Sequence, residues 1–113
     1  MNLHRTQFRV IQTAAVGVVS SDTLLDLQQH GSRVVGRYSG GTVQRGRLVG
    51  VVKDSVLRFR YVQREQSGEV HAGRSVCTVD VADGGRRYLR EHFIWETRQG
   101  TGVNVFEEIP HAS

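Results

Sequence analysis

The sequence predicts an all-β protein, folded as an antiparallel up-and-down β-barrel of about eight strands. Three observations support this fold class. The 113 residues include 13 glycines and a single proline, a composition typical of strands joined by tight turns. Turn signals recur along the chain at the spacing found in sandwiches and barrels. No stretch shows the apolar period of a long amphipathic helix.

The length predicts a single domain, residues 1–113, with a modest core. We expect the barrel to occupy about residues 7–109, with residues 1–6 and 110–113 as flexible tails. The single cysteine, Cys77, excludes an internal disulfide. The sequence shows neither a signal-peptide pattern nor an apolar run of transmembrane length. The expectation is therefore a cytoplasmic protein with no membrane partner.

Turn signals separate most of the predicted strands. The turns are His30-Gly31-Ser32, Gly40-Gly41, Asp54-Ser55, Glu65–Gly68, Asp83-Gly84-Gly85 and Gln99–Gly102. The strands are Gln7–Ile11, Thr23–Gln29, Arg33–Ser39, Val43–Lys53, Val56–Arg64, Glu69–Val81, Arg87–Thr97 and Val103–Ile109. No helix separates them, so successive strands are most simply antiparallel neighbours.

Each strand has one face that we expect to point into the barrel, chosen by side-chain bulk and by the exclusion of charge. In chain order the inward residues are Leu25, Leu27 and Gln29; Val34, Gly36 and Tyr38; Gly46, Leu48, Gly50 and Val52; Leu57, Phe59, Tyr61 and Gln63; Gly73, Ser75 and Cys77; and Leu89, Glu91, Phe93 and Trp95. The alternation leaves the inward face open for residues 69–81 and 103–109, where Asn104 is a candidate.

Turn lengths agree with these faces, because a slip of one residue would invert a strand. Gly31-Ser32 and Asp54-Ser55 fit two-residue loops, and Gly31 suits a type II′ turn. Asp83-Gly84-Gly85 fits a three-residue loop with glycine in the left-handed conformation. The implied pairs mostly place small residues opposite large ones, as a small barrel needs. They are Gly50 with Phe59, Phe59 with Gly73, Gly73 with Trp95, Ser75 with Phe93, Cys77 with Glu91, and Gly36 with Gly46.

Glu91 is the strongest pointer to function. It lies on the same strand face as Leu89, Phe93 and Trp95, whereas His92 points to the other face of that strand. A lone carboxylate is rarely buried without a partner or a function. Apolar surroundings should raise its pKa, so that it could serve as an acid, a base or a cation ligand. The alternative is a structural carboxylate, hydrogen-bonded to a tyrosine or an arginine.

Three groups of residues carry a resemblance that covers roughly Phe8 to Ile109. They are Tyr38-Ser39-Gly40-Gly41 with Gly46 and Leu48-Val49-Gly50; Phe59-Arg60-Tyr61 with Gly68 and Gly73; and Asp83-Gly84 with Leu89, Glu91, Phe93, Trp95, Gly102 and Glu107-Glu108. This order resembles a family of short, uncharacterised bacterial proteins that look like avidin-type barrels. The resemblance implies an avidin-like or lipocalin-like barrel with an interior ligand and self-association.

Some relatives in that family carry the name N-acetylglutamate synthase, which implies an acyltransferase fold with a pyrophosphate-binding loop on a helix. The chain has no glycine-rich loop leading into a helix, so we do not extend that activity to it. Avidin itself binds biotin with several tryptophans, whereas this chain has one, Trp95. Biotin binding is therefore not carried over.

The preferred interpretation is a protein that binds a small molecule in the barrel interior, through apolar and aromatic side chains with a few polar ones. The candidate ligand-binding residues are Gln29, Tyr38, Phe59, Tyr61, Gln63, Ser75, Glu91, Phe93, Trp95 and Asn104. One alternative is an enzyme that uses Glu91 as general acid or base, with Tyr61 or Tyr38 orienting the substrate. Another is a packed structural or interaction module. Neither a cofactor nor a catalytic residue is assigned.

Other patterns point to less specific chemistry. No histidine pair has zinc-motif spacing, so no metal site is predicted, and Cys77 is expected to be a buried, inert thiol. The net charge is +4 and 14 of the 15 basic residues are arginine. Arg58, Arg60 and Arg64 form an outward ladder, but the stretch offers no outward aromatics on which bases could stack. A solvated face is favoured over a nucleic-acid partner.

Several outward residues are apolar, which predicts self-association as a homodimer or homotetramer. They are Val35, Val49, Val51, Val76 and Ile94.

Overall fold

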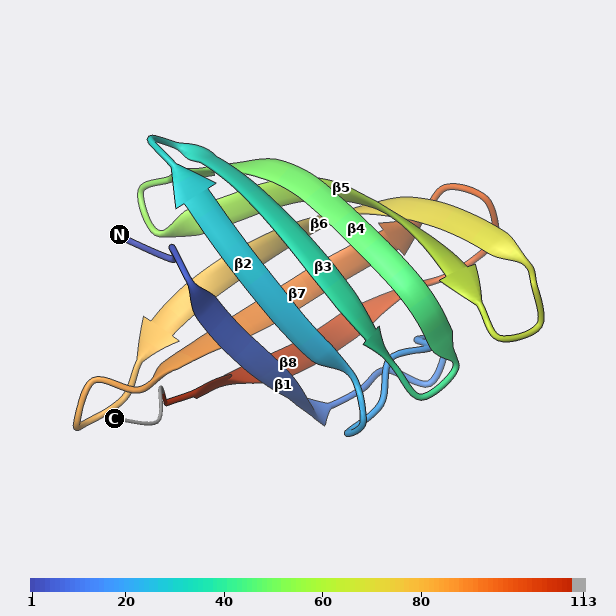
Figure 1. Cartoon of the computed structure of the whole chain (residues 1–113), viewed down its shortest axis with the longest axis horizontal. Coiled ribbons are helices and arrows are strands. Elements are labelled where there is room, and N and C mark those ends of the chain that lie inside the picture. Colours follow the sequence, from blue (N-terminus) through green and yellow to red (C-terminus); the bar gives the residue numbers. More distant parts are fainter. Residues whose placement is uncertain (111–113) are drawn as a thin grey trace.

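Eight antiparallel strands follow one another around a closed barrel (Figure 1). They are β1 (Thr6–Gln12), β2 (Leu24–His30), β3 (Arg33–Gly40), β4 (Val43–Lys53), β5 (Val56–Glu65), β6 (Val70–Val81), β7 (Arg87–Trp95) and β8 (Thr101–Ile109). The computed structural model describes residues 1–110, so most of the predicted C-terminal tail lies outside the described residues. Because β8 pairs with β1, no sheet edge is left in the barrel. The predicted fold class is confirmed, and every strand boundary lies within two residues of its predicted position.

The predicted inward faces are also confirmed. All of those residues are buried except Gln29 and Gly50, which are half-buried. The sequence left the inward face open in two strands: Ser75 and Cys77 point inward in β6, and Asn104 and Phe106 point inward in β8. Glu91 is buried while its neighbour His92 is exposed. Among residues 1–110 there is no helix with the length and apolarity that a membrane crossing requires.

The hairpins explain how the register is fixed. Gly31 has a positive φ of 64° and Ser32 does not, as a type II′ turn requires. Asp54 and Ser55 both adopt positive φ, 52° and 62°, which is the type I′ conformation without its usual glycine. In the β6–β7 loop the Ala82 amide donates to the Arg86 carbonyl over 2.8 Å, enclosing the predicted three-residue loop.

Two predicted cross-strand pairs were wrong. Gly36 lies opposite Leu48, and Gly46 lies opposite Tyr38, because a bulge before Gly40 shifts the β3–β4 register. The β5–β6 loop closes between the Glu65 amide and the Glu69 carbonyl. That closure places Tyr61, not Phe59, opposite Gly73, so Phe59 faces Ser75.

The corrected register pairs aromatic rings with glycines across neighbouring strands. A Cβ atom built on Gly46 would lie 2.2 Å from Cζ of Tyr38, and one on Gly73 would lie 2.3 Å from the Tyr61 hydroxyl. The two tyrosine rings therefore occupy space that any other residue at those positions would fill. This contact fixes where both hydroxyl groups lie inside the barrel.

The two ends of the barrel are closed differently. At the end with the tight β2–β3, β4–β5 and β6–β7 turns, Leu3 is fully buried and its amide donates to Gln29 Oε1 over 2.8 Å. Part of the expected N-terminal tail thus packs into the core. At the other end the segment between β1 and β2, which we call the roof loop (residues 13–23), crosses the opening.

Candidate ligand-binding cavity

A cavity of about 40 Å³ lies inside the barrel beneath the roof loop. Its roof is formed by Gly17, Val18 and Val19, and its walls are mostly apolar and aromatic. The polar residues in its lining are Tyr38, Tyr61, Gln63, Glu91 and Asn104. The volume suffices for a few water molecules, and it lies far below the several hundred Å³ of a typical ligand pocket.

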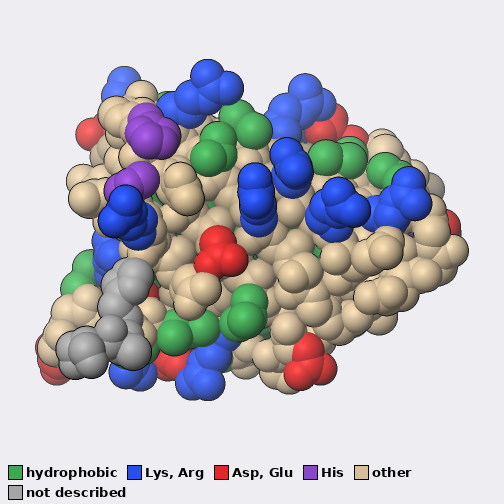
Figure 2. Space-filling view, in the orientation of Figure 1, with side chains coloured by type: hydrophobic (Ala, Val, Ile, Leu, Met, Phe, Trp, Pro, Cys, Tyr) green, Lys and Arg blue, Asp and Glu red, His purple; other side chains and the backbone are tan. Residues whose placement is uncertain are grey.

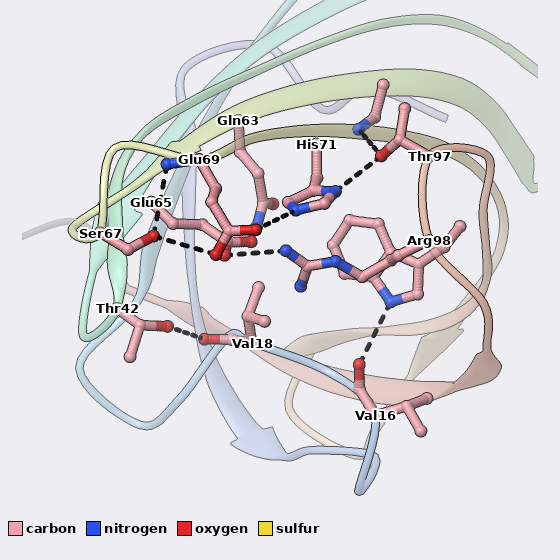
Figure 3. Close-up of polar contacts among 12 residues, drawn as sticks. Val16, Val18, Thr42, Gln63, Glu65, Ser67, Glu69, His71, Thr97 and Arg98 are labelled. Carbon is pink, nitrogen blue, oxygen red and sulfur yellow. Dashed lines mark hydrogen bonds and ion pairs between the residues drawn. The ribbon is translucent and has the colours of Figure 1, made fainter.

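Three hydrogen bonds hold the part of the roof loop that lies over this cavity, residues 14–18. The Trp95 indole Nε1 donates to the Val16 carbonyl over 3.1 Å, and the Thr42 hydroxyl donates to the Val18 carbonyl over 2.8 Å (Figure 3). The Ala14 amide donates to Asn104 Oδ1 over 3.2 Å. Two of the three barrel partners, Trp95 and Asn104, also line the cavity.

Glu91 is held at the cavity wall by donors from the two neighbouring strands. Ser75 Oγ donates to Oε2 over 2.6 Å, and Asn104 Nδ2 donates to Oε1 over 2.9 Å. Asn104 therefore links Glu91 to the roof loop, because its other amide atom accepts from Ala14. These two donors, and not a tyrosine or an arginine, satisfy the carboxyl group.

Burial and charge decide the protonation of the interior groups. Burial raises the pKa of Glu91, although the hydrogen bonds from Ser75 and Asn104 oppose the rise. Burial, and then the Glu91 charge, raise the pKa of Tyr38, of Tyr61 and of the Cys77 thiol. Both phenols and the thiol thus stay protonated near neutral pH, so Cys77 is a poor nucleophile.

The Tyr61 hydroxyl stands out among the polar groups of the interior. Within residues 1–110, its oxygen is the one buried side-chain polar atom left without a hydrogen-bond partner. The ring packs edge-on against Phe59 and Trp95, which fixes it in place. An unpaired buried hydroxyl costs about 1–3 kcal/mol, and such groups in native proteins call for an explanation.

A second polar network joins the cavity to the mouth of the barrel. The Tyr38 hydroxyl donates to Gln63 Oε1 over 2.8 Å, and Gln63 Nε2 donates to Glu65 Oε2 over 3.0 Å. Arg98 completes the chain with an ion pair to Glu65 at 2.9 Å, and its guanidinium lies 4.7 Å from the centre of the Trp95 ring (Figure 3). Although burial opposes it, the hydrogen bonds from Arg98 and Gln63 hold the pKa of Glu65 below its usual value.

Glu65, Glu69 and His71 could together offer a metal ion three ligand atoms, which lie within 4.8 Å of one another. His71 Nδ1 lies 2.8 Å from the Thr97 hydroxyl and Nε2 lies 3.3 Å from Glu69 (Figure 3). Arg98 already neutralises Glu65, so a cation would have to displace the guanidinium. The sequence-based expectation that there is no metal site stays a prediction.

The structure gathers most of the candidate residues around one space. Eight of the ten line the cavity: Tyr38, Phe59, Tyr61, Gln63, Glu91, Phe93, Trp95 and Asn104. Ser75 does not line it but holds Glu91. Gln29 lies at the opposite end of the barrel, where its side chain donates to the Met1 and Gly31 carbonyls.

Sequence reasoning missed the roof loop and Arg98. The loop has neither a period-2 pattern nor a motif; its only signal is a mostly apolar stretch, Ala14–Val19, between two strands. Arg98 falls between the strand predicted to end at Thr97 and the turn predicted to begin at Gln99, and its contact with Trp95 depends on how the β7–β8 connection folds.

A family model described as "Avidin-like protein" matches residues 1–109, nearly the whole chain. No curated protein and no solved structure matches the chain.

Proposed function

Because the chain belongs to the avidin-like protein family, we propose that it binds a small molecule inside the barrel, in the cavity beneath the roof loop. Family membership supports small-molecule binding in general. The observation that carries the location is Tyr61, which lines the cavity and whose buried hydroxyl has no hydrogen-bond partner among residues 1–110. A ligand atom that accepts from Tyr61 would satisfy it.

Entry of a ligand requires the roof loop to move, because the free volume beneath it is only about 40 Å³. The hydrogen bonds from Ala14, Thr42 and Trp95 each contribute on the order of 1 kcal/mol. The half-buried side chains of Val18 and Val19 add a modest apolar contact. Binding energy from the ligand can offset the loss of these contacts.

The lining suggests an uncharged ligand. Burial favours the neutral form of Glu91, and no cationic side chain lines the cavity in the described chain. An isolated ion in such a space would cost several kcal/mol. The best fit is an apolar or aromatic molecule with one hydrogen-bond acceptor for Tyr61 and a polar group near Glu91.

Trp95 offers a direct test, because it is the chain's one tryptophan and lies in the cavity lining. A panel of uncharged aromatic and heterocyclic fragments is titrated while its emission is recorded, with biotin as a charged reference. We expect saturable shifts from fragments that carry an acceptor, and their loss in Tyr61→Phe. If no fragment shifts the emission, or if Tyr61→Phe responds equally, the proposal is wrong.

Two alternatives from the sequence stay open to test. An enzyme using Glu91 and Tyr61 would have to free a carboxyl oxygen that already accepts a hydrogen bond. The evidence for such an enzyme would be substrate turnover that the Glu91→Gln variant has lost. The observation that speaks for a packed structural or interaction module is the small volume of the cavity. In that case no small molecule would bind inside the barrel. The cytoplasmic location and the bacterial origin also remain predictions.

A further inference from the structure

The outer face of β3–β6 collects most of the positive charge of the molecule. Nine exposed basic residues point outward from these four strands, against one acidic residue, Asp80. The nine are Arg33, Arg37, Arg45, Arg47, Lys53, Arg58, Arg60, Arg64 and Arg74. We call this surface the arginine face. Figure 2 shows part of it, with Lys and Arg side chains in a band across the molecule and hydrophobic side chains beside them.

Strand pairing places arginines of the arginine face directly opposite one another. Arg37 lies opposite Arg47, Arg45 opposite Arg64, and Arg60 opposite Arg74. Like charges in this position destabilise an antiparallel sheet. The pairs therefore oppose folding in the free protein, and a bound anion would remove that cost.

Ion pairs are rarer on this face than on the rest of the described chain. Of the six basic residues elsewhere, four pair with a glutamate: Arg9, Arg86, Arg87 and Arg98. On the arginine face, within residues 1–110, only Arg60 has such a partner, Glu96. The charge of this face is thus available to a partner.

Apolar side chains lie between these cations, and they decide which kind of anion fits. One surface hollow combines Val49, Val76 and Ile94 with Arg58, Arg60 and Arg74. A second combines Val62 and Val70 with Arg45, Arg47 and Arg64. A nucleic-acid backbone would leave the exposed valines uncovered, and the aromatics on which bases could stack point inward. A second copy of the chain would bring two strongly cationic faces together.

We propose that the arginine face is a docking surface for a protein segment that carries acidic and apolar side chains together. Carboxylates of the segment would form bidentate pairs with the opposed guanidinium groups. Its apolar side chains would cover the valines in the two hollows. The proposal does not depend on the cavity or on any interior ligand.

Fluorescence anisotropy of short labelled peptides tests this directly. The probes are a peptide of glutamate and leucine, one of the same length in which serine replaces leucine, a single-stranded DNA oligonucleotide, and vesicles containing phosphatidylserine. We expect the glutamate–leucine peptide to bind most tightly. Its affinity should fall by about tenfold or more when ionic strength rises from about 0.1 M to about 1 M, because the screening length falls from ~10 to ~3 Å.

Two variants with the same change in charge locate the surface. Arg47→Glu places an acid opposite Arg37, so it should fold at least as well as the parent, and it should weaken peptide binding by about tenfold. Arg90→Glu, on the outward side of β7, should bind within about twofold of the parent.

Four outcomes would overturn the proposal. They are no peptide binding, equal losses in the two variants, tighter binding of DNA or vesicles than of the peptide, and self-association through this face at about 0.1 M salt.

Discussion

Tyr61 allows the interior site to be tested by removing one oxygen atom. Tyr61→Phe deletes a buried hydroxyl that has no partner within the described chain, so we expect the ligand-free protein to gain about 1 kcal/mol of stability. The same change should abolish ligand retention. Chemical denaturation and ligand titration check the two effects. A loss of stability in the ligand-free protein would show that the hydroxyl is structural.

Glu91 predicts a specific dependence of stability on pH. Burial raises its pKa above the ordinary value of 4.5, so the folded state holds a proton that the unfolded state releases. The stability associated with this proton is complete below about pH 4.5 and is lost as the pH rises through the folded-state pKa.

Glu91→Gln keeps the shape and the hydrogen-bonding capacity of the side chain, so it should fold and its stability should vary less over this pH range. The gap between variant and parent should widen in favour of the variant as pH rises. Thermal unfolding of both proteins from pH 4 to pH 8 measures this difference in stability. A constant deficit of the variant at every pH would show instead that the ionised carboxylate is stabilised in the fold.

The residues around the cavity show what a sequence can predict at this scale. The period-2 pattern gave the inward positions of Glu91 and Trp95, because alternation is a local property of a strand. It could not assign their partners, since Ser75 and Asn104 come from other strands and their contacts depend on exact register. Gln29 obeyed the same alternation, but it lies beyond the cavity, near the opposite end.

Among the elements, the β3–β4 hairpin depends on the fit of a ring against a glycine. Gly46→Ala should destabilise the protein by about 1–3 kcal/mol, because the added methyl group would meet the Tyr38 ring. A double-mutant cycle with Tyr38→Val isolates this contact, and the two changes should be less costly together than the sum of the separate costs. Strict additivity would show that the ring can move aside.

The roof loop can be loosened without touching the cavity. Thr42→Val removes the hydroxyl that bonds the Val18 carbonyl, so acrylamide should quench Trp95 more strongly and a ligand should associate faster. Thr101→Val is the matched control, because its hydroxyl bonds Phe93 and not the loop. Equal quenching in both variants would mean that this bond does not hold the loop closed.

Turn chemistry explains which elements could be predicted. Gly31-Ser32 and Asp54-Ser55 fix two registers through local backbone preference, and both were correct. The β3–β4 register was wrong, because the bulge before Gly40 leaves no signal in the alternation. The roof loop was not predicted, since its position comes from contacts with side chains of two strands and of the β3–β4 turn.

For the whole molecule, the distribution of charge bears on self-association. Family membership supports oligomers in general, and the five apolar residues predicted to mediate contact are all exposed. Arginines between them should repel a second copy at low salt. We therefore expect association across these strands to strengthen as ionic strength rises. Sedimentation velocity at about 0.1 M and about 1 M salt measures it, and a monomer at high micromolar concentration in both would contradict the prediction.

The arginine face could not be predicted, because its residues are spread over four strands and become neighbours only through pairing. In the sequence, Arg37 and Arg47 are separated by a turn, as are Arg60 and Arg74. Register places each pair side by side. Alternation alone assigned these residues to the outside, which is correct, and gave no account of their clustering.

Native mass spectrometry of the freshly purified protein tests interior binding most directly. A small molecule bound in the cavity should survive gentle ionisation, so we expect each chain of the parent protein to carry one additional, uncharged small mass. The same preparation of Tyr61→Phe should show the polypeptide alone. If the parent also shows only its polypeptide mass, and a crystal structure shows side chains filling the space beneath the roof loop, the barrel does not bind a ligand there.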